Sequence, residues 1–173
     1  MRTVSIHQPH YLIWLGLLDK IAKSDLFVLL DNVQYKKRNF QNRTQYSTKD
    51  GSKLLSLPVN CKGAQPQNTP IKNIRISDHS VLRKHLTTLK HRYGKTPGWD
   101  LIKEQLYDIY SLKHENLVDI NRQLLDLTLS CYQINTPVIN ASDLNVYGKK
   151  NELLVDILQK VDADIYLSGN GAR

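Results

Sequence analysis

The spacing of apolar side chains at the start of the chain predicts a strand, a helix and a second strand. Residues 3–7 (Thr-Val-Ser-Ile-His) form a short segment rich in β-branched side chains, which favours a strand. Residues 12–23 repeat apolar side chains at helical spacing, and residues 26–30 form an apolar run typical of a strand buried on both faces. The predicted apolar face of the helix comprises Leu12, Leu15, Leu18, Ile21 and Ala22. This order predicts an α/β fold.

A hairpin and a further strand are predicted next. The strand-like segments at residues 43–47 and 53–59 are separated by an Asp50-Gly51 turn signal. Residues 60–70 have loop composition, and residues 71–76 alternate apolar and polar side chains as a half-buried strand does.

Helical patterns dominate the second half of the chain. They cover residues 78–93 (with Ser77 or Asp78 as the cap), 100–110, 112–132 and 149–160, and short strands are expected at 137–141 and 164–168. The predicted fold is therefore α/β: a doubly wound, mostly parallel Rossmann-like sheet with a β-hairpin and a helical insertion at about residues 78–134.

The length of 173 residues suits one domain, and no internal repeat or long linker divides it. The last predicted strand runs into a glycine-rich turn at residues 168–173. Such a turn normally leads into another element, so we expect the chain to be truncated at its C-terminus or completed from elsewhere.

Composition excludes several classes of protein. Hydrophobic residues make up 40% and charged residues 23%, which is ordinary for a globular chain. No apolar run approaches the roughly 18 residues of a membrane span, and no signal peptide is visible, so a cytoplasmic protein is expected. Cys61 and Cys131 lack metal-like spacing, and Cys131 is expected to be a small buried side chain in a helix. The net charge of +8 predicts an anionic partner.

The first candidate site follows the first strand. His7, Gln8, His10 and Tyr11 stand at its carboxyl end, where open α/β sheets bind ligands. Imidazoles there could transfer protons, or bind phosphate when protonated. Asp31 ends the neighbouring strand and could converge on the same place. The alternative is that the histidines only cap the strand.

The second candidate site is the polar, basic segment at residues 31–43. Its candidate ligand-binding residues are Gln34, Lys36, Lys37, Arg38, Gln41, Asn42 and Arg43. Arginine binds phosphate bidentately and lysine acts as a point charge, and interleaved aromatic rings could stack on a base or sugar. The alternative is a solvated loop.

The third candidate is the terminal turn, where Ser168 and Gly169 could present backbone N–H groups to a phosphate. No dinucleotide or P-loop signature is present, so the sequence supports neither NAD nor Walker-type ATP binding. No metal motif occurs, and no cofactor can be named. His79, His85, His91 and His114 lie in helical patterns, and His85 and His91 are expected on a solvated basic face.

Taken together, several segments resemble the signature of the WbqC-like family. They are residues 5–12 (SIHQPHYL), 14–16 (WLG), 19–25 (DKIAKSD), 27–38 (FVLLDNVQYKKR), 41–43 (QNR), 57–59 (LPV) and 166–169 (YLSG). The family usually has proline in place of Ile13 and often asparagine in place of His10, so His7 is the better catalytic candidate.

The resemblance implies a bacterial protein encoded among genes for O-antigen or other surface polysaccharides. The expected function is a transferase that modifies a nucleotide-linked amino sugar. Lys37, Arg38 and Arg43 would hold the diphosphate and His7 would be the general base, with Asp31 or Tyr11 orienting it or the acceptor.

Two alternatives stay open. One is an adenylate-forming enzyme, because the opening also resembles pantothenate-synthetase-like nucleotidyltransferases, although their HxGH motif is absent. The other is a non-catalytic module that binds RNA or nucleotides. The preferred partner is an anionic small molecule, and the sequence predicts no oligomeric state.

Overall fold

The computed structural model describes residues 1–60 and 69–169. Cys61, most of the predicted loop at 60–70 and the last four residues of the terminal turn lie outside the described residues. In the described part, no helix is long and apolar enough to cross a membrane.

The predicted parallel sheet is present. Its strands are β1 (Thr3–His7), β2 (Leu26–Leu29), β7 (Val138–Asn140) and β8 (Ile165–Tyr166). All neighbours pair in parallel, in the order β7-β2-β1-β8. Every residue of β2 is buried, which explains why this strand has no polar alternate positions. The order and direction of these strands confirm the α/β, Rossmann-like prediction.

Alternate side chains of the sheet face two different apolar layers. Phe27 and Leu29 pack with α1 (Leu15–Ala22) and with the helical layer. Val28 and Ile6 pack on the other face against α5 (Asn151–Lys160). Helices therefore cover both faces of the sheet, as in a doubly wound fold.

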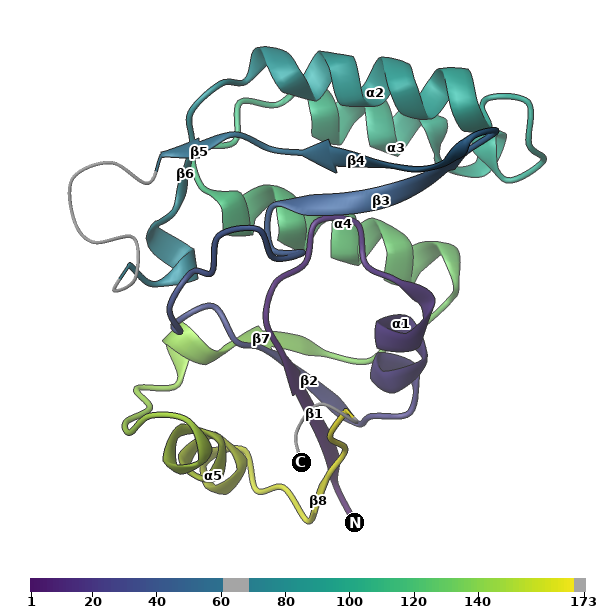
Figure 1. The fold of residues 1–173 in the computed structure, drawn as a ribbon. Coiled ribbons are helices and arrows are strands. Elements are labelled where there is room, and N and C mark those ends of the chain that lie inside the picture. Colours follow the sequence, from purple (N-terminus) through teal and green to yellow (C-terminus); the bar gives the residue numbers. More distant parts are fainter. Residues whose placement is uncertain (61–68, 170–173) are drawn as a thin grey trace.

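A hairpin and three helices complete the structure (Figure 1). These elements are β3 (Arg43–Thr48), β4 (Gly51–Ser56), α2 (Ser80–Tyr93), α3 (Trp99–Ser111) and α4 (Leu117–Cys131). Shorter elements are β5 (Val59–Asn60), η2 (Ile71–Asn73), β6 (Arg75–Ile76) and η3 (Ala141–Asp143). The predicted hairpin is confirmed, with Gly51 at a φ of 120° that favours glycine.

The first helix is shorter than predicted and turns a different face to the core. It begins only at Leu15, because Leu12 has a left-handed φ of 55°. Leu15 is 71% exposed, whereas Leu17 is buried beside Leu18 and Ile21. The prediction of an apolar face through Leu12 and Leu15 was therefore wrong.

Three further predictions need correction. The half-buried strand at 71–76 is a 3₁₀ turn followed by a two-residue strand, because Ile71 and Ile74 are both buried at a spacing of three residues. The third long helix starts at Leu117 rather than at 112, because Asn116 and Asp119 form a capping box there. Cys131 is exposed at the end of α4, not buried.

The packing predicts a large cost for truncating the middle of β2. Phe27 is fully buried between β1 and β7, so Phe27→Ala should lower the free energy of unfolding by about 3–5 kcal/mol. Urea denaturation followed by circular dichroism measures this. Val155→Ala, at a half-exposed position of α5, is the control and should change stability by less than about 0.5 kcal/mol. Equal effects of the two substitutions would contradict this account of the core.

Candidate functional site

The strand order reverses at β1, and this places two predicted segments at one point of the sheet. β1 pairs with β2 on one side and with β8 on the other, and Val4 is aligned with Tyr166. His7 and Gly169 each lie three residues beyond this aligned pair, at the carboxyl end of the strands. A crevice at such a switch point is the usual ligand site of open α/β sheets. Ser168 and Gly169 are exposed there.

His7 has a defined tautomer. Its Nδ1 lies 2.9 Å from the carbonyl oxygen of Gln8, and a carbonyl can only accept, so Nδ1 carries the hydrogen. Burial lowers the pKa of His7, the hydrogen bond to Gln8 opposes this, and the charge of Lys20 adds to the lowering. The ring is therefore neutral at pH 7, and its Nε2 has the lone pair that a general base needs.

His10 extends this site. Its ring lies edge-on to the ring of His7, with 4.6 Å between the centroids, and is 5.9 Å from the ring of Phe40. Burial, together with the charge of His7, lowers the pKa of His10 to about 4. Since both imidazoles are neutral at pH 7, they do not supply the positive charge for an anion; nearby lysines and arginines must supply it.

The basic segment folds directly over the histidine segment. The Tyr11 amide donates to the Phe40 carbonyl at 3.0 Å, and Gln41 Nε2 donates to Gln8 Oε1 at 2.8 Å. Gln41 is fully buried and also accepts a hydrogen bond from the Lys36 amide. The two segments that sequence reasoning selected separately are therefore adjacent.

Within the basic segment, the cations and the amides have different surroundings. Lys36, Lys37 and Arg38 are exposed, whereas Arg43 is half-buried, and its Nε has no hydrogen-bond partner among the described residues. Asn42 is buried and donates to the Leu57 carbonyl. Gln34 is exposed and forms a β-bridge with Pro70. Lys36, Lys37 and Arg38 are thus accessible to a ligand, whereas the Arg43 Nε is enclosed. Gln41 and Asn42 hold the loop in shape.

Tyr11 and Asp31 have partners of their own. Tyr11 is fully buried, and its hydroxyl lies 2.5 Å from the Tyr110 hydroxyl and 2.9 Å from His85 Nδ1. The Asp31 carboxylate accepts hydrogen bonds from the Ser142 amide and hydroxyl, at 2.9 and 2.7 Å. Neither side chain is hydrogen-bonded to His7 within the described residues.

Two of the other histidines, His85 and His91, differ in their exposure to solvent. His91 is exposed, as predicted. The prediction that His85 is solvated was wrong: it is 6% exposed and faces Tyr11, and burial lowers its pKa to about 4. The partner of His85 is far away in the sequence, so the basic residues beside it gave no sign of burial.

Lys20 is a site residue that sequence reasoning missed. Its Nζ donates to the carbonyl oxygen of Ile6 at 3.0 Å and lies 5.8 Å from the centroid of the Tyr166 ring. Burial lowers its pKa. Lys20 therefore places a cation between β1 and β8. Only the packing of α1 on the sheet shows this, because the helical pattern itself gave Lys20 no special position.

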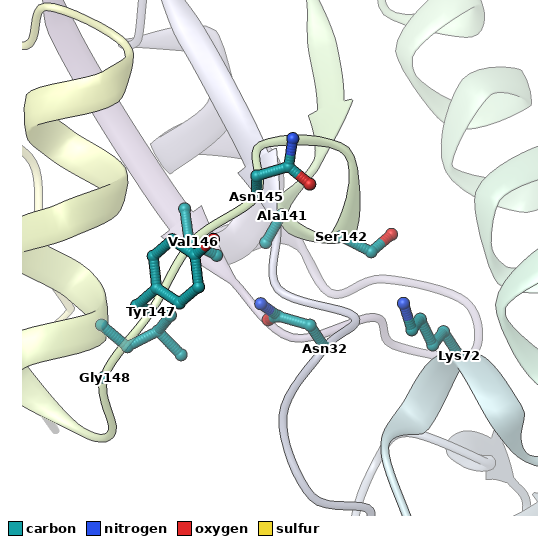
Figure 2. A pocket seen from close by; sticks show the side chains of 9 residues that line it. Asn32, Lys72, Ala141, Ser142, Asn145, Val146, Tyr147 and Gly148 are labelled. Atoms are coloured by element: carbon teal, nitrogen blue, oxygen red, sulfur yellow. The ribbon is translucent and has the colours of Figure 1, made fainter.

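A cavity of about 420 Å³ lies at the carboxyl ends of β2 and β7 (Figure 2). It is lined by Asn32, Lys72, Ala141, Ser142, Asn145, Val146, Tyr147, Gly148 and Leu153. Figure 2 shows Asn32 between Lys72 on one side and the loop that carries Tyr147 and Gly148 on the other. The bond between Asp31 and Ser142 fixes one wall of the cavity. This recess shares the carboxyl edge of the sheet with His7, and of the cavity-lining residues, only Asn32 belongs to a segment selected from sequence.

The lowered pKa of His10 predicts how stability depends on pH. The unfolded chain binds a proton near the ordinary pKa of 6.5, but the folded chain does so only near 4. The unfolded state therefore binds more protons between these values, and stability falls as pH decreases through this window. Between pH 6.5 and 4.5 the free energy of unfolding should fall less in His10→Asn than in the unaltered chain, by on the order of 1 kcal/mol. Urea unfolding at several pH values measures it.

His91→Asn is the matched control, since His91 is exposed. It should leave the pH dependence of unfolding as in the unaltered chain. If both variants, or neither, flattened the curve, the burial of His10 would not be responsible.

Comparison with known proteins agrees with the pattern of these segments. The profile of the WbqC-like protein family matches residues 8–173. The chain is 33% identical over 174 residues to an uncharacterized protein of Mycobacterium tuberculosis, covering 100% of this chain and 74% of that protein. No solved structure matches. The chain therefore belongs to the WbqC-like protein family.

Proposed function

We propose that this protein is a transferase that modifies a nucleotide-linked sugar, bound along the carboxyl edge of the parallel sheet. The observation that carries the proposal is the reversal of strand order at β1, with His7 at the end of that strand. Nucleotide ligands bind at such switch points because the diverging loops leave a crevice there. The family's occurrence among polysaccharide genes, as the sequence resemblance implies, supports a sugar as the group modified.

His7 is the general base of the proposed reaction. Its Nδ1–H is held by the Gln8 carbonyl, so Nε2 faces the reaction with a free lone pair. The lowered pKa keeps this nitrogen unprotonated at pH 7. As the hydroxyl or amine of the nucleotide-linked sugar attacks the transferable group of the donor, its proton passes to Nε2 and the bond between that group and the rest of the donor breaks. The rest of the donor leaves with the bonding electrons, and the protonated His7 can return the proton to it.

The exposed cations of the basic segment are proposed to hold the diphosphate. Lys37 and Arg38 are exposed, and the packing of Phe40 against His10 brings their loop beside the histidines. Arg43 is half-buried and its Nε is enclosed, so in this proposal the terminal amino groups of its guanidinium donate to the phosphate. Lys20, whose Nζ bonds the Ile6 carbonyl and lies near the Tyr166 ring, adds a further cation close to His7.

The Asp31–Ser142 pair and the cavity beside it are proposed to take another part of the substrate. Amides, a hydroxyl and the Tyr147 ring line this recess, and such groups suit a sugar's hydroxyls and apolar ring face. In this proposal Asp31 shapes the recess through Ser142 rather than acting on His7.

Substitution of His7 tests the catalytic part of this proposal. His7→Gln keeps an N–H that can reach the Gln8 carbonyl but removes the base. It should lower kcat by roughly 100-fold or more while changing substrate Kd by only a few fold. In the unaltered enzyme, kcat/KM should fall as pH drops through the lowered pKa of His7.

The exposed His91 gives the matched control for this experiment, and His91→Gln should retain full turnover. Turnover that survives in His7→Gln would remove His7 from the mechanism. A loss of both binding and turnover would give His7 a binding role instead.

Substitution of Arg43 tests where the diphosphate binds. A thermal-shift screen of nucleotide sugars, with ATP and magnesium as a separate arm, should yield a stabilising nucleotide sugar. Arg43→Ala should weaken the binding of that ligand by roughly 10- to 100-fold, the effect of one lost charged hydrogen bond of about 1.5–3 kcal/mol. Lys53→Ala, exposed on the same hairpin, should not. Stabilisation by ATP alone would favour an adenylate-forming enzyme over the proposal.

A further inference from the structure

A second recess lies far from the parallel sheet, between α2 and α3. Figure 1 shows these helices side by side in the helical layer. The cleft has a volume of about 880 Å³, which suits a small-molecule ligand. It is lined by His79, Ser80, Arg83, Leu86, Thr87, Lys90, Tyr107, Tyr110 and Ser111. Arg83, Thr87 and Lys90 follow one another at helical spacing and so share one face of α2.

The charge of α2 differs from that of its neighbours. It contains four lysines and arginines and no acidic residue. Each other α-helix of the described chain has an ion pair within it or at its end: Lys23–Asp19, Lys103–Asp100, Arg122–Asp126 and Lys160–Asp156. No such pair involves α2 within the described residues. The four cations of this one helix equal half of the net charge of +8, and within the described residues no ion pair balances them.

The position of Arg83 is not explained by the stability of the helix. It lies in the first turn of α2, where the helix dipole disfavours a cation. Hydrogen bonds from Ser80 lower the pKa of the Asp78 carboxyl, and the charge of Lys84 adds to this lowering. Arg83 instead borders the cleft, and no carboxylate lines the cleft among the described residues. An anion bound there would offset the unfavourable placement.

The wall formed by α3 supplies aromatic and hydroxyl groups. Lys90 Nζ lies 5.9 Å from the centroid of the Tyr107 ring, which draws the ammonium group across the cleft. Tyr110 is fixed by its hydrogen bond to Tyr11. Ser111 adds a hydroxyl at the end of α3. One wall is thus positively charged and the other is rigid and able to donate hydrogen bonds.

We infer that the α2–α3 cleft binds a small molecule carrying at least two phosphate-type groups, with Arg83 holding one and Lys90 another. The step of seven positions from Arg83 to Lys90 spans about 10 Å along the helix axis, and the long side chains of the two cations can approach each other from there. None of the lining residues belongs to the carboxyl edge of the sheet. The inference is therefore independent of the proposed transferase site.

The experiment is a titration of the whole chain with sodium tripolyphosphate at low salt, read from the amide chemical shifts of α2 and α3. The double variant Arg83→Gln/Lys90→Gln should weaken binding at these amides roughly tenfold or more, as expected for losing charged hydrogen bonds. The matched control is Lys84→Gln/Arg92→Gln. It removes the same charge from the same two ends of α2, outside the cleft, and should weaken binding by less than about twofold, the size of a screened surface effect.

Two results would overturn the inference. Equal weakening by both double variants would mean attraction to a basic helix surface rather than binding in the cleft. Shifts produced by a short single-stranded oligonucleotide but not by tripolyphosphate would mean a nucleic-acid surface. His7→Gln should leave the α2 and α3 titration unchanged, so failure of this inference and failure of the proposed transferase can be told apart.

Discussion

The position of β1 as an inner strand, paired in parallel on both sides, is the constraint on which the structure depends. Its carbonyl and amide groups are used by β2 and β8, Val4 and Ile6 pack into the apolar layer of α5, and Ser5 accepts a hydrogen bond from Ser24. The last hydrogen bond of the ladder runs from the Leu30 amide to the His7 carbonyl. His7 is consequently fixed by backbone pairing at the point where the strands diverge, with only its side chain left for chemistry.

Gln41 connects this point to the rest of the site. Its side chain bonds both Gln8 and the Lys36 amide, and its carbonyl accepts from Asn121 of α4. A fully buried amide with all these partners is costly to displace, because each broken bond leaves a buried polar group unsatisfied. One residue thus orders the histidine segment, the basic loop and the helical layer relative to each other. The hydrogen bonds of Gln41 hold the backbone of the basic segment in place. The exposed cations on this segment can therefore move without displacing it.

Elements whose side chains follow a simple period were predictable from the sequence. The buried run of β2, the hairpin around Gly51 and the helix α5 all appear close to where the pattern placed them. The start of α1 was not predictable, because the left-handed backbone of Leu12 is set by tertiary contacts and not by its own preference. The 3₁₀ turn at Ile71 was likewise not predictable, because the apolar and polar side chains of its segment alternate as in a strand.

The site was predictable only in part, for a related reason. Strand-end residues such as His7 follow from topology, but burial depends on partners distant in sequence. Tyr11 is turned into the core by His85 and Tyr110, and Lys20 reaches the sheet only because α1 packs as it does. The cavity beside Asn32 is lined by segments more than a hundred residues apart, so no local sequence pattern predicts it.

The most direct test of the proposed site is to map amide chemical shifts while adding the nucleotide sugar that stabilises the protein most. The account predicts that the largest changes fall at residues 7–11, 36–43 and 167–169, with further changes around Asn32 and Ser142. Changes confined to α2 and α3, or spread evenly over the basic surface, would contradict a substrate site at the carboxyl edge of the sheet.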